Sequence, residues 1–344
     1  MDKKQLYPLK FDPIYKPYIW GGTKLSRLGK RINPGEIVAE SWEISDHGRD
    51  ISTAKNGPLK GKTLRELIKT YGEDICPATD IGRFPILIKY IDASNRLSVQ
   101  VHPDDRYARE HEPPGEMGKT ECWYILDAPP GARLILGAKK GLTRQQFKTL
   151  VEENRIEQGL NRINVSRGDV IYIESGTVHA LLEGIMVCEV QENSDTTYRL
   201  YDWGRVGSNG RPRPLHIEKA LDVINYVPEE EYEQYMKKLV IPYDKSKQNV
   251  VHSLIREKYF NIDLIKYSKA LDMCLEDCHF HTLNILNGEG IIGCPGGELG
   301  FQKGDSLLIP RPVGEYTILP GAQKEIADKQ KLKGQGVEIL QTFL

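Results

Sequence analysis

Gly168-Asp-Val-Ile-Tyr-Ile-Glu-Ser-Gly-Thr-Val-His179 is one of two stretches in this chain with the same pattern, and the other is Gly304-Asp-Ser-Leu-Leu-Ile-Pro-Arg-Pro-Val-Gly-Glu315. Each has a Gly-Asp turn, an apolar strand, a second turn with proline or glycine, and a final polar residue. Two copies of one β-barrel unit are the simplest explanation, because a repeated pattern indicates a duplicated structural unit. His179 is replaced by Glu315 in the second copy, so the two barrels are expected to differ in chemistry.

The length of 344 residues suggests two domains, at roughly 150 residues for each. We predict a first domain at residues 1–240, in which an N-terminal flap, helical insertions and a helical connector surround one barrel. Residues 241–344 are predicted to form a second, degenerate barrel without metal, since short strands spaced by glycine turns are typical of antiparallel sandwiches and barrels. The predicted fold class is mainly β, with two β-barrels and added helices.

Helices are predicted in three places within the first domain. Thr63 and Thr143 are each followed three residues later by Glu or Gln, which is the capping-box pattern at the start of a helix. They predict helices over residues 63–75 and 144–153. Residues 216–238 are rich in Glu, Lys, Ala and Leu and are predicted to form the helical connector between the domains.

The charge and hydropathy patterns exclude several classes of protein. The formal net charge is −1, from 47 basic and 48 acidic side chains, which gives no general electrostatic reason to bind nucleic acid or an anionic membrane. The first residues lack the apolar core of a signal peptide, and no run of about 18 apolar residues predicts a transmembrane helix. We therefore expect a cytoplasmic protein, whose 6 cysteines are reduced thiols.

The stretch Leu97-Ser-Val-Gln-Val-His-Pro-Asp-Asp105 contains the first candidate functional residues. In an extended strand the side chains at i and i+2 leave the same face, so Gln100 and His102 point together, away from the neighbouring valines. Pro103 ends the strand, and residues 104–118, charged and rich in proline and glycine, are predicted to be a loop. On its own, this polar pair could equally face water.

Glu121 and His179 complete a candidate metal site with Gln100 and His102. Imidazole and carboxylate ligands together suit Zn²⁺ or another borderline divalent metal, and three protein ligands plus an open position are typical of catalytic zinc. The ligands are far apart in the sequence, so a preformed barrel must bring their strands together. Taken alone, His179 could instead be a buried strand histidine that hydrogen-bonds to the backbone. Because the second copy lacks this histidine, one Zn²⁺ per chain is expected.

The order Gln-x-His, then Glu, then Gly-x-x-His is the signature of the cupin superfamily. The chain also contains Lys119-x-Glu121, Gly176-Thr-Val-His179 and Asn193-Ser-Asp-Thr-Thr-Tyr-Arg199. Together with Leu97–Asp105, these motifs resemble the type I mannose-6-phosphate isomerases (phosphomannose isomerases) of the short bacterial form. The resemblance implies two cupin-type (jelly-roll) barrels and a zinc-dependent aldose-ketose isomerase that interconverts mannose 6-phosphate and fructose 6-phosphate.

The resemblance also implies a role for each site residue. The active-site arginine of the family falls on Arg199. Ser98 and Lys119 match positions that line the substrate pocket, and Arg205 lies where longer relatives carry a basic residue implicated in holding the phosphate. The chain departs from these longer relatives directly after Arg199, where it reads Leu-Tyr-Asp-Trp-Gly-Arg205. The zinc ligands of the family fall on Gln100, His102, Glu121 and His179.

The chemistry of an aldose-ketose conversion is compatible with these roles. A proton moves between C2 and C1 through an enediol, whose developing negative charge a divalent metal and Arg199 would stabilise. Arg199 stays protonated at ordinary pH, which favours an electrostatic or proton-positioning role over that of a general base. Lys119 could bind the phosphate or carry the proton. Other candidates for proton transfer are Glu183, Glu189 and Asp195.

Two other functions remain open from the residues. A cupin metalloenzyme of another type, such as a non-haem iron dioxygenase, also uses two histidines and a carboxylate. A non-catalytic sugar-binding cupin would also keep the barrel. The basic residues Lys119, Arg199 and Arg205 favour a small sugar phosphate as the partner, with neither nucleic acid nor membrane involved. The sequence leaves the oligomeric state open.

Two further patterns have simpler interpretations. Cysteine and histidine gather at Cys274, Cys278, His279 and His281, as they would at a second metal site. Cys278 and His279 are adjacent and would face opposite sides of a strand, so a degenerate barrel position is the preferred interpretation. Residues 288–293 match the Gly-x-Gly-x-x-Gly dinucleotide motif, but no βαβ unit surrounds them, which indicates a hairpin.

Overall fold

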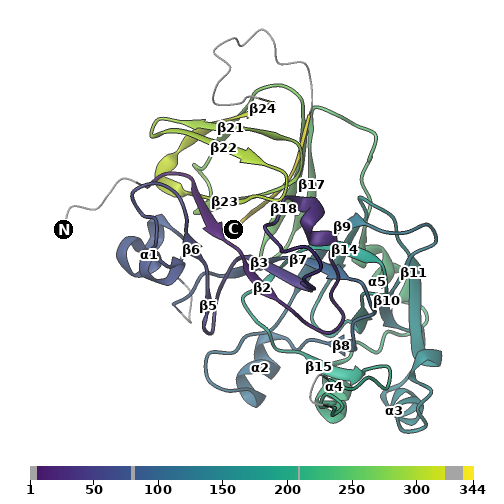
Figure 1. Cartoon of the computed structure of the whole chain (residues 1–344). Helices are drawn as coiled ribbons and strands as arrows, with labels where there is room; N and C mark the ends of the chain where they lie inside the picture. The colour runs from purple at the N-terminus through teal and green to yellow at the C-terminus, as the bar shows by residue number, and fades with distance from the viewer. Residues whose placement is uncertain (1–5, 79–81, 208–209, 322–335) are drawn as a thin grey trace.

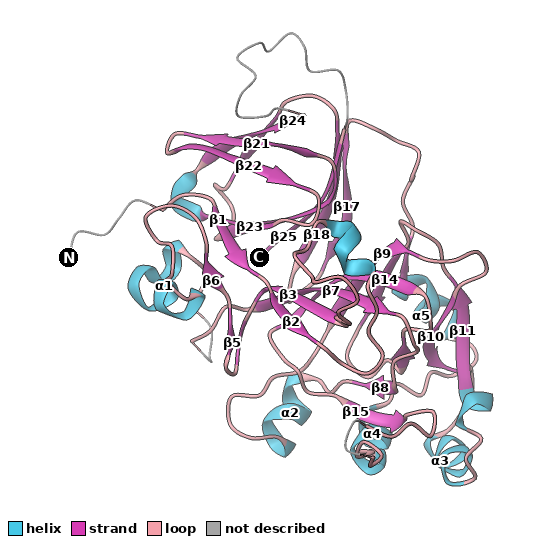
Figure 2. Cartoon of the chain, viewed as in Figure 1, coloured by secondary structure: helices cyan, strands magenta, loops and turns pink. Residues whose placement is uncertain are grey.

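The computed structural model describes residues 6–78, 82–207, 210–321 and 336–344. The described chain consists of two halves, each built from a large and a small antiparallel sheet, with helices at the periphery (Figures 1 and 2). The predicted class, mainly β with two similar units and added helices, is confirmed. Each unit is a pair of sheets, as in a jelly roll, and its described strands do not close into a continuous ring.

The N-terminal half contains a seven-stranded and a five-stranded sheet, and a two-stranded ribbon lies beside them. The seven-stranded sheet has the order β16 (Val240–Ile241), β12 (Val170–Ile173), β9 (Glu121–Asp127), β14 (Ile185–Glu192), β7 (Ile86–Ala93), β3 (Glu40–Ile44) and β2 (Ile14–Lys16). The five-stranded sheet has the order β11 (Leu160–Asn164), β10 (Arg133–Ala138), β13 (His179–Ala180), β8 (Val99–Val101) and β15 (Tyr198–Tyr201). The ribbon pairs β4 (Asp46–His47) with β5 (Asp50–Ile51).

The C-terminal half contains a seven-stranded and a four-stranded sheet, and it includes two strands from the start of the chain. Leu9 pairs with Leu308, which places β1 in the larger sheet. The larger sheet has the order β17 (Val250–Arg256), β18 (Asn261–Tyr267), β25 (Val337–Phe343), β20 (Phe280–Asn287), β23 (Ser306–Pro310), β1 (Leu9–Asp12) and β6 (Thr53–Ala54). The smaller sheet has the order β19 (Leu271–Cys274), β24 (Glu315–Pro320), β21 (Glu289–Cys294) and β22 (Gly297–Gln302).

The helices follow the predicted positions, with one exception. Thr63 and Thr143 both form complete capping boxes, and the connector is two helices, α4 and α5. The exception is the segment predicted as a loop, which contains α2. Asp104 caps this helix by accepting a hydrogen bond from the backbone of Tyr107 at 2.7 Å, so a local cap outweighs the loop-like composition. The helices are α1 (Leu64–Tyr71), α2 (Asp105–His111), α3 (Arg144–Glu152), α4 (Ile217–Val223) and α5 (Tyr232–Leu239), and the 3-10 helices are η1 (Lys24–Leu28), η2 (Gly72–Asp74), η3 (Ile156–Gly159) and η4 (Arg311–Val313).

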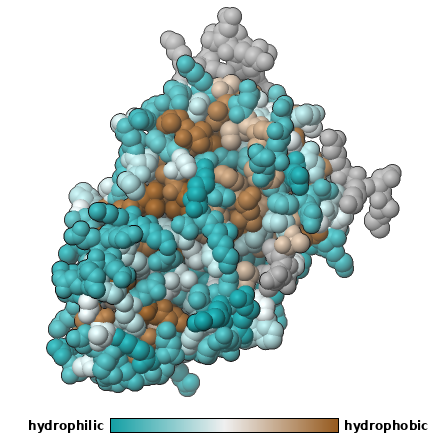
Figure 3. Space-filling model, turned by 180° about the vertical axis from the view of Figure 1, so that it is seen from behind, coloured by the Kyte–Doolittle hydropathy of each residue, from teal (hydrophilic) through white to brown (hydrophobic). Residues whose placement is uncertain are grey.

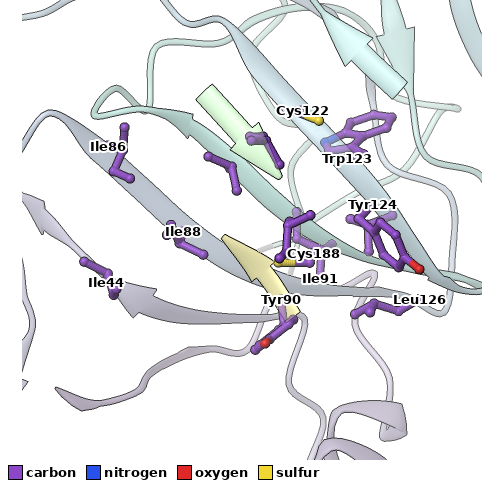
Figure 4. Packing of buried hydrophobic residues seen from close by; sticks show 14 of the residues in the cluster. Ile44, Ile86, Ile88, Tyr90, Ile91, Cys122, Trp123, Tyr124, Leu126 and Cys188 are labelled. Atoms are coloured by element: carbon purple, nitrogen blue, oxygen red, sulfur yellow. The ribbon is translucent and has the colours of Figure 1, made fainter. Parts of the chain in front are cut away.

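The largest apolar core lies between the two seven-stranded sheets. Ile86, Ile88 and Tyr90 of β7 pack in this core, as Figure 4 shows from close by. Residues of the C-terminal half, such as Phe280, belong to the same cluster. Because successive residues of a strand point to opposite faces, Lys89 points away from this core. From behind, the most extensive hydrophobic surface lies over the C-terminal half (Figure 3). The face of β7 that carries Lys89 is turned instead toward the interior of the N-terminal half, where Ile91 and Trp123 are buried.

The repeated pattern corresponds to strands β12 and β23. Gly168 and Gly304 have the same left-handed φ of 84° at the start of the two copies. Ile173 pairs with Glu121 in the first copy, and Ile309 pairs with His281 in the second. His281 therefore takes the place of Glu121.

After the second turn, the structural counterpart of His179 lies one position later than the aligned Glu315. Glu315 is exposed, whereas Tyr316 is buried and its hydroxyl lies 2.8 Å from His281 Nδ1. Alternation along β24 puts only one of two neighbouring residues inside, so Tyr316, and not Glu315, takes the interior place of His179. The second half thus contains a histidine-tyrosine hydrogen bond where the first half gathers candidate metal ligands.

Candidate metal centre

The structure brings the four predicted metal ligands together inside the N-terminal half. The ligand atoms of His102, Glu121 and His179 all lie within 4.8 Å of one another, and all three residues are buried. Gln100 joins them, since its amide nitrogen lies 3.3 Å from His179 Nε2. The side-chain amide of Gln100 can be turned by 180°, which exchanges its nitrogen and its oxygen. Gln100 can therefore present its oxygen to the same point. Residues distant in the sequence therefore form one compact set of donor atoms.

Strand pairing produces this arrangement from both sheets of the half. His179 on β13 lies directly opposite Gln100 on β8, in the five-stranded sheet. Glu121 begins β9 in the seven-stranded sheet, so its carboxylate reaches the site from the other sheet. Gly176 has a φ of 86° in the turn before His179, and a Cβ there would lie 2.5 Å from Asn225 Oδ1. The turn that delivers His179 therefore requires glycine.

Hydrogen bonds to the backbone fix the orientation of both imidazoles. His102 Nδ1 lies 2.8 Å from the carbonyl oxygen of Thr196, and His179 Nδ1 lies 2.8 Å from that of Thr177. A carbonyl oxygen can only accept, so each Nδ1 carries the proton and donates it. Each Nε2 is then left with a lone pair that points into the centre. This is the usual way in which a protein prepares histidines to bind a metal ion.

The electrostatics of the centre also fit a cation. Burial, reinforced by the charge of Lys119, lowers the pKa of His102 to about 3, and burial lowers the pKa of His179. Burial would by itself raise the pKa of Glu121, but the ammonium group of Lys119 beside it holds this pKa well below its usual range. The centre therefore combines two neutral imidazoles with a carboxylate, the protonation states in which these groups bind metals.

One contact in the centre calls for a positive charge between its atoms. His179 Nε2 and Glu121 Oε1 lie 3.2 Å apart, and within the described chain Glu121 Oε1 has no hydrogen-bond donor. Both atoms present lone pairs when His179 is neutral and protonated on Nδ1. Two buried lone pairs at this distance are unfavourable without a cation that both can bind. The donor set of imidazole, carboxylate and amide therefore fits a divalent metal ion.

Lys119 lies directly beside these donors. Its Nζ is 3.0 Å from His102 Nε2 and forms an ion pair with Glu121. Lys119 is itself buried, and its ammonium group occupies the polar interior at the same end of β9. The amine is therefore within reach of any molecule that contacts the metal centre.

A cleft of about 220 Å³ opens next to the metal centre. The predicted site residues Ser98, Gln100, Lys119 and Arg199 all line it. Ser98 Oγ accepts a hydrogen bond of 3.2 Å from Arg199 Nε, and Arg199 Nη1 donates to the carbonyl of Pro214 at 2.9 Å. Burial, and then the charge of Arg213, lowers the pKa of Arg199. The guanidinium is thus oriented by two contacts, with part of its edge left toward the cleft.

Arg205 is not among the residues that line this cleft, whereas Arg213 is. Arg205 Nη2 binds Asp202 Oδ1 at 2.5 Å, and its Nη1 donates to the carbonyl of Arg96. Arg213 forms two hydrogen bonds with the same carboxylate, from Nε at 2.8 Å and from Nη2 at 2.5 Å. The two arginines are therefore joined through Asp202, and Arg213 is the one beside the cleft.

Sequence reasoning missed several residues of the cleft. Lys89 lies in its wall, and its interruption of an otherwise apolar strand was the available signal. Of the three other candidates for proton transfer, Glu189 and Asp195 line the cleft, whereas Glu183 is exposed and lies outside its lining. The remaining lining residues are Tyr18, Trp20, Glu40, Ile91, Leu97, Trp123 and Thr197.

The cysteine and histidine cluster of the C-terminal half is a hydrogen-bonded pair. Cys278 Sγ lies 3.2 Å from His281 Nε2, and His279 points elsewhere, with its Nδ1 3.4 Å from the carbonyl of Glu73. Cys274 is exposed. In the described part of the chain, His102, Glu121 and His179 form the one group of three such side chains close enough to share a metal ion.

Glu192 supports the strand that carries Lys119 and Glu121, and it makes stability depend on pH. Its Oε2 accepts a hydrogen bond of 2.7 Å from the backbone of Thr120. Burial, with the charge of Asp105, raises the pKa of Glu192 to about 8. In the unfolded chain a glutamate has a pKa of about 4.3, so between these values the folded state binds more protons than the unfolded state. Stability should therefore fall as the pH rises from about 4.3 to 8.

We expect Glu192→Gln to remove this pH dependence, because glutamine keeps the acceptor without the charge. The variant should gain about 1 to 3 kcal/mol of unfolding free energy relative to the wild type at pH 8 and little at pH 5. Urea unfolding at the two pH values measures the difference. Glu157→Gln, which alters an exposed ion pair with Arg162, is the control and should behave alike at both. An equal gain for Glu192→Gln at pH 5 and pH 8 would contradict the assignment.

Among the described residues, no helix is both long and apolar enough to cross a membrane.

A family model for the catalytic domain of type I phosphomannose isomerases matches residues 8–153. "Probable mannose-6-phosphate isomerase GmuF" of Bacillus subtilis is 39% identical over 91% of this chain and 96% of its own length. Mannose-6-phosphate isomerase ManA of the same organism is 37% identical, over 90% and 95%.

Solved structures show the same likeness. The crystal structure of mannose 6-phosphate isomerase from Bacillus subtilis superposes with a TM-score of 0.84 at 33% identity and covers 98% of this chain and 99% of that one. A variant of phosphomannose isomerase from Salmonella typhimurium superposes with a TM-score of 0.73 at 16% identity, over 98% and 99%, which shows a shared fold.

Proposed function

Because the chain belongs to the type I phosphomannose isomerase family and is an isomerase, we propose that it interconverts mannose 6-phosphate and fructose 6-phosphate with one Zn²⁺ per chain. The observation that carries the metal proposal is the pair of lone pairs on His179 Nε2 and Glu121 Oε1, 3.2 Å apart and buried. Gln100, His102, Glu121 and His179 would hold the ion, and this donor set suits zinc. When bound, the ion supplies Lewis acidity that stabilises negative charge on the sugar oxygens.

Lys119 is the residue that we propose for proton transfer. Its amine lies 3.0 Å from His102 Nε2, beside the donors, and the residue lines the cleft. A sugar whose C1 and C2 oxygens face the metal centre would bring both carbons close to this amine. In its neutral amine form, Lys119 would take the proton from one carbon, and the ammonium group that results would return it to the other, through an enediol of the open-chain sugar.

Arg199 is proposed to stabilise the charge of that enediol. The guanidinium is held by Ser98 Oγ and by the carbonyl of Pro214, so it does not need to reorganise during the reaction. Its neighbour Arg213 adds a second positive charge on the same side of the cleft. We propose that this side receives the phosphate group, with Ser98 as a further donor, and that the reacting carbons face the metal centre.

Arg213→Ala is expected to weaken substrate binding more than Arg205→Ala. A hydrogen bond between charged groups contributes roughly 1.5 to 3 kcal/mol, so losing direct contact with phosphate should raise KM for mannose 6-phosphate by about tenfold or more. Arg205, predicted for the phosphate, would act only by orienting Asp202, and its loss should raise KM by about threefold. Steady-state kinetics of the two variants, with Arg162→Ala as a surface control, measures the difference. Equal KM effects at 205 and 213 would contradict the assignment.

A coupled assay tests the proposed reaction itself. Purified protein should form fructose 6-phosphate from mannose 6-phosphate, with a dehydrogenase-linked readout of the product. Mannose without phosphate should be converted far more slowly, because the arginine side of the cleft would then bind nothing. Failure to convert mannose 6-phosphate in the presence of zinc would contradict the proposal.

Two wider assignments rest on the same proposal. Residues 1–240 are proposed as the catalytic domain and residues 241–344 as a degenerate domain without metal, with β1 and β6 of the first contributed to the large sheet of the second. A sugar phosphate is the proposed partner, and the cytoplasm is the proposed location, because sugar phosphates are charged and do not cross membranes freely.

A further inference from the structure

Four residues lie directly opposite one another across four neighbouring strands of the N-terminal half. Trp42 of β3 pairs with Lys89 of β7, Lys89 pairs with Glu189 of β14, and Glu189 pairs with Trp123 of β9. Directly opposed side chains leave the same face of an antiparallel sheet. Lys89, Glu189 and Trp123 line the cleft, so this row forms part of its wall. Figure 4 shows Trp123 on its strand.

The tryptophan at each end of the row holds the carboxylate of a glutamate in place through a hydrogen bond. Trp123 Nε1 donates a hydrogen bond of 2.7 Å to Glu189 Oε2. Trp42 Nε1 donates one of 2.6 Å to Glu40 Oε2, two residues earlier on the same strand. An indole N–H is only a donor and its ring is rigid, so each carboxylate is held in one orientation. All of these side chains are buried.

The two carboxylates flank the ammonium group of Lys89. Its Nζ lies 3.5 Å from Glu189 Oε1 and 3.8 Å from Glu40 Oε2, and 4.7 Å from the centre of the Trp42 ring. Asp195 Oδ1 lies 3.9 Å away on the open side of the cleft. These ion pairs are all at least 3.5 Å long, and the structure gives Lys89 Nζ no hydrogen bond to a described residue. A buried ammonium with three donors is thus held in place while its donors remain available.

We propose that Glu189 and Glu40 are positioning residues, each oriented by a tryptophan, that hold the Lys89 ammonium at the cleft wall so that its donors meet the oxygens of the open-chain sugar. This inference rests on the proposed function. It adds a second donor to the substrate site, besides the arginines that line the same cleft. Lys89 touches the sugar, whereas Glu189, Glu40 and the two tryptophans act through Lys89.

The same row is connected to the metal centre. The ring of Trp123 packs edge-on against His179, with ring centres 5.4 Å apart. Glu121 precedes Trp123 by two residues on β9, so both side chains leave the same face of the strand. We call the row of Trp42, Lys89, Glu189 and Trp123 the Lys89 wall. Trp123 links this wall to two of the proposed metal ligands, His179 and Glu121. A substrate held by both would have a fixed orientation between them.

A double-mutant cycle on the zinc-loaded protein tests the inference. Glu189→Gln and Trp123→Phe should each lower kcat for mannose 6-phosphate by about tenfold to a hundredfold, with a smaller change in KM, since a displacement of about 1 Å is enough for such a loss. In a Lys89→Met background, Glu189→Gln should cause no further loss, because it acts only through Lys89. Zinc content and Tm are measured for every variant.

Glu43→Gln is the matched control for burial of an ion pair. Glu43 lies on the same strand as Glu40 and forms an equally buried ion pair with Lys30 at 2.6 Å, outside the cleft. It should lower Tm while kcat stays unchanged. Losses that multiply when Glu189→Gln is combined with Lys89→Met would overturn the inference, as would a loss of kcat in Glu43→Gln equal to that in Glu189→Gln. No turnover by the wild-type protein would instead overturn the proposed function.

Discussion

Removal of the metal ion is expected to abolish isomerisation, by about a thousandfold or more, and added zinc should restore it. Lewis-acid stabilisation of a developing oxyanion contributes several kcal/mol to the transition state, and each 1.4 kcal/mol is about a tenfold change in rate. The protein is dialysed against a chelator, its metal content is measured by atomic emission, and fructose 6-phosphate formation is followed before and after zinc is returned. Full activity in verified metal-free protein would refute the proposed mechanism.

Two histidine variants show whether the ion lies where we propose. His179→Ala should lose both zinc and turnover, because it removes a ligand that strand pairing delivers to the centre. His281→Gln alters a buried histidine of the C-terminal half, beside Cys278, and should keep one zinc per chain with normal turnover. A zinc content near two that falls to one in His281→Gln would contradict the proposal of a single site.

The second largest effect is expected from Arg199→Ala, which should lower kcat for mannose 6-phosphate by about a hundredfold to a thousandfold. Removing one oriented donor from a site that stabilises an oxyanion has an effect of about this size. Zinc content should be unchanged, because the guanidinium of Arg199 hydrogen-bonds to Ser98 and to the carbonyl of Pro214. Arg199 is the strand partner of the proposed ligand Gln100, but that pairing is made by the backbone, which the substitution leaves in place. Steady-state kinetics and metal analysis of the same preparation separate the two quantities.

Arg162→Ala provides the control for loss of a positive charge. Arg162 is an exposed partner of Glu157, and surface ion pairs contribute little, so both kcat and Tm should stay close to those of the wild type. Turnover by Arg199→Ala that is equal to the wild type would remove Arg199 from the reaction. Loss of zinc in Arg199→Ala would mean that the residue supports the metal centre instead.

The four candidate ligands could be predicted because each lies in a local pattern. Gln100 and His102 are two residues apart on a strand, so alternation alone places them on one face. Gly176 marks the turn that leads to His179, and its left-handed backbone is a property that sequence indicates. The structure adds what no local pattern contains, namely that Glu121 reaches the same point from the opposite sheet.

The Lys89 wall could not be predicted, because it depends on lateral strand order. The strands of Trp42, Lys89, Glu189 and Trp123 are neighbours in the order β3, β7, β14 and β9, which is not their order in the chain. The sequence shows only a lysine within an apolar strand and two tryptophans elsewhere. Non-sequential pairing is set by the packing of the whole sheet, so the row becomes visible only in three dimensions.

The choice between Arg205 and Arg213 could not be predicted from the sequence either. Arg205 and Arg213 both bind Asp202, and both lie between the same strand and the same helix. Resemblance to longer relatives pointed to Arg205, the nearer of the two in sequence to Arg199. Which arginine faces the cleft depends on the paths of residues 202–207 and 210–216, which lie outside the helices and strands, and sequence patterns carry little information about such paths.

The pairing of Leu9 with Leu308 has a consequence for biosynthesis. During translation, β1 is made long before its partner β23, which follows it by roughly 300 residues. Until β23 has been made, β1 has one open edge, and the large sheet of the C-terminal half is incomplete. Contacts of such long sequence separation form slowly, so we expect the growing chain to acquire protease resistance only after β23 has left the ribosome.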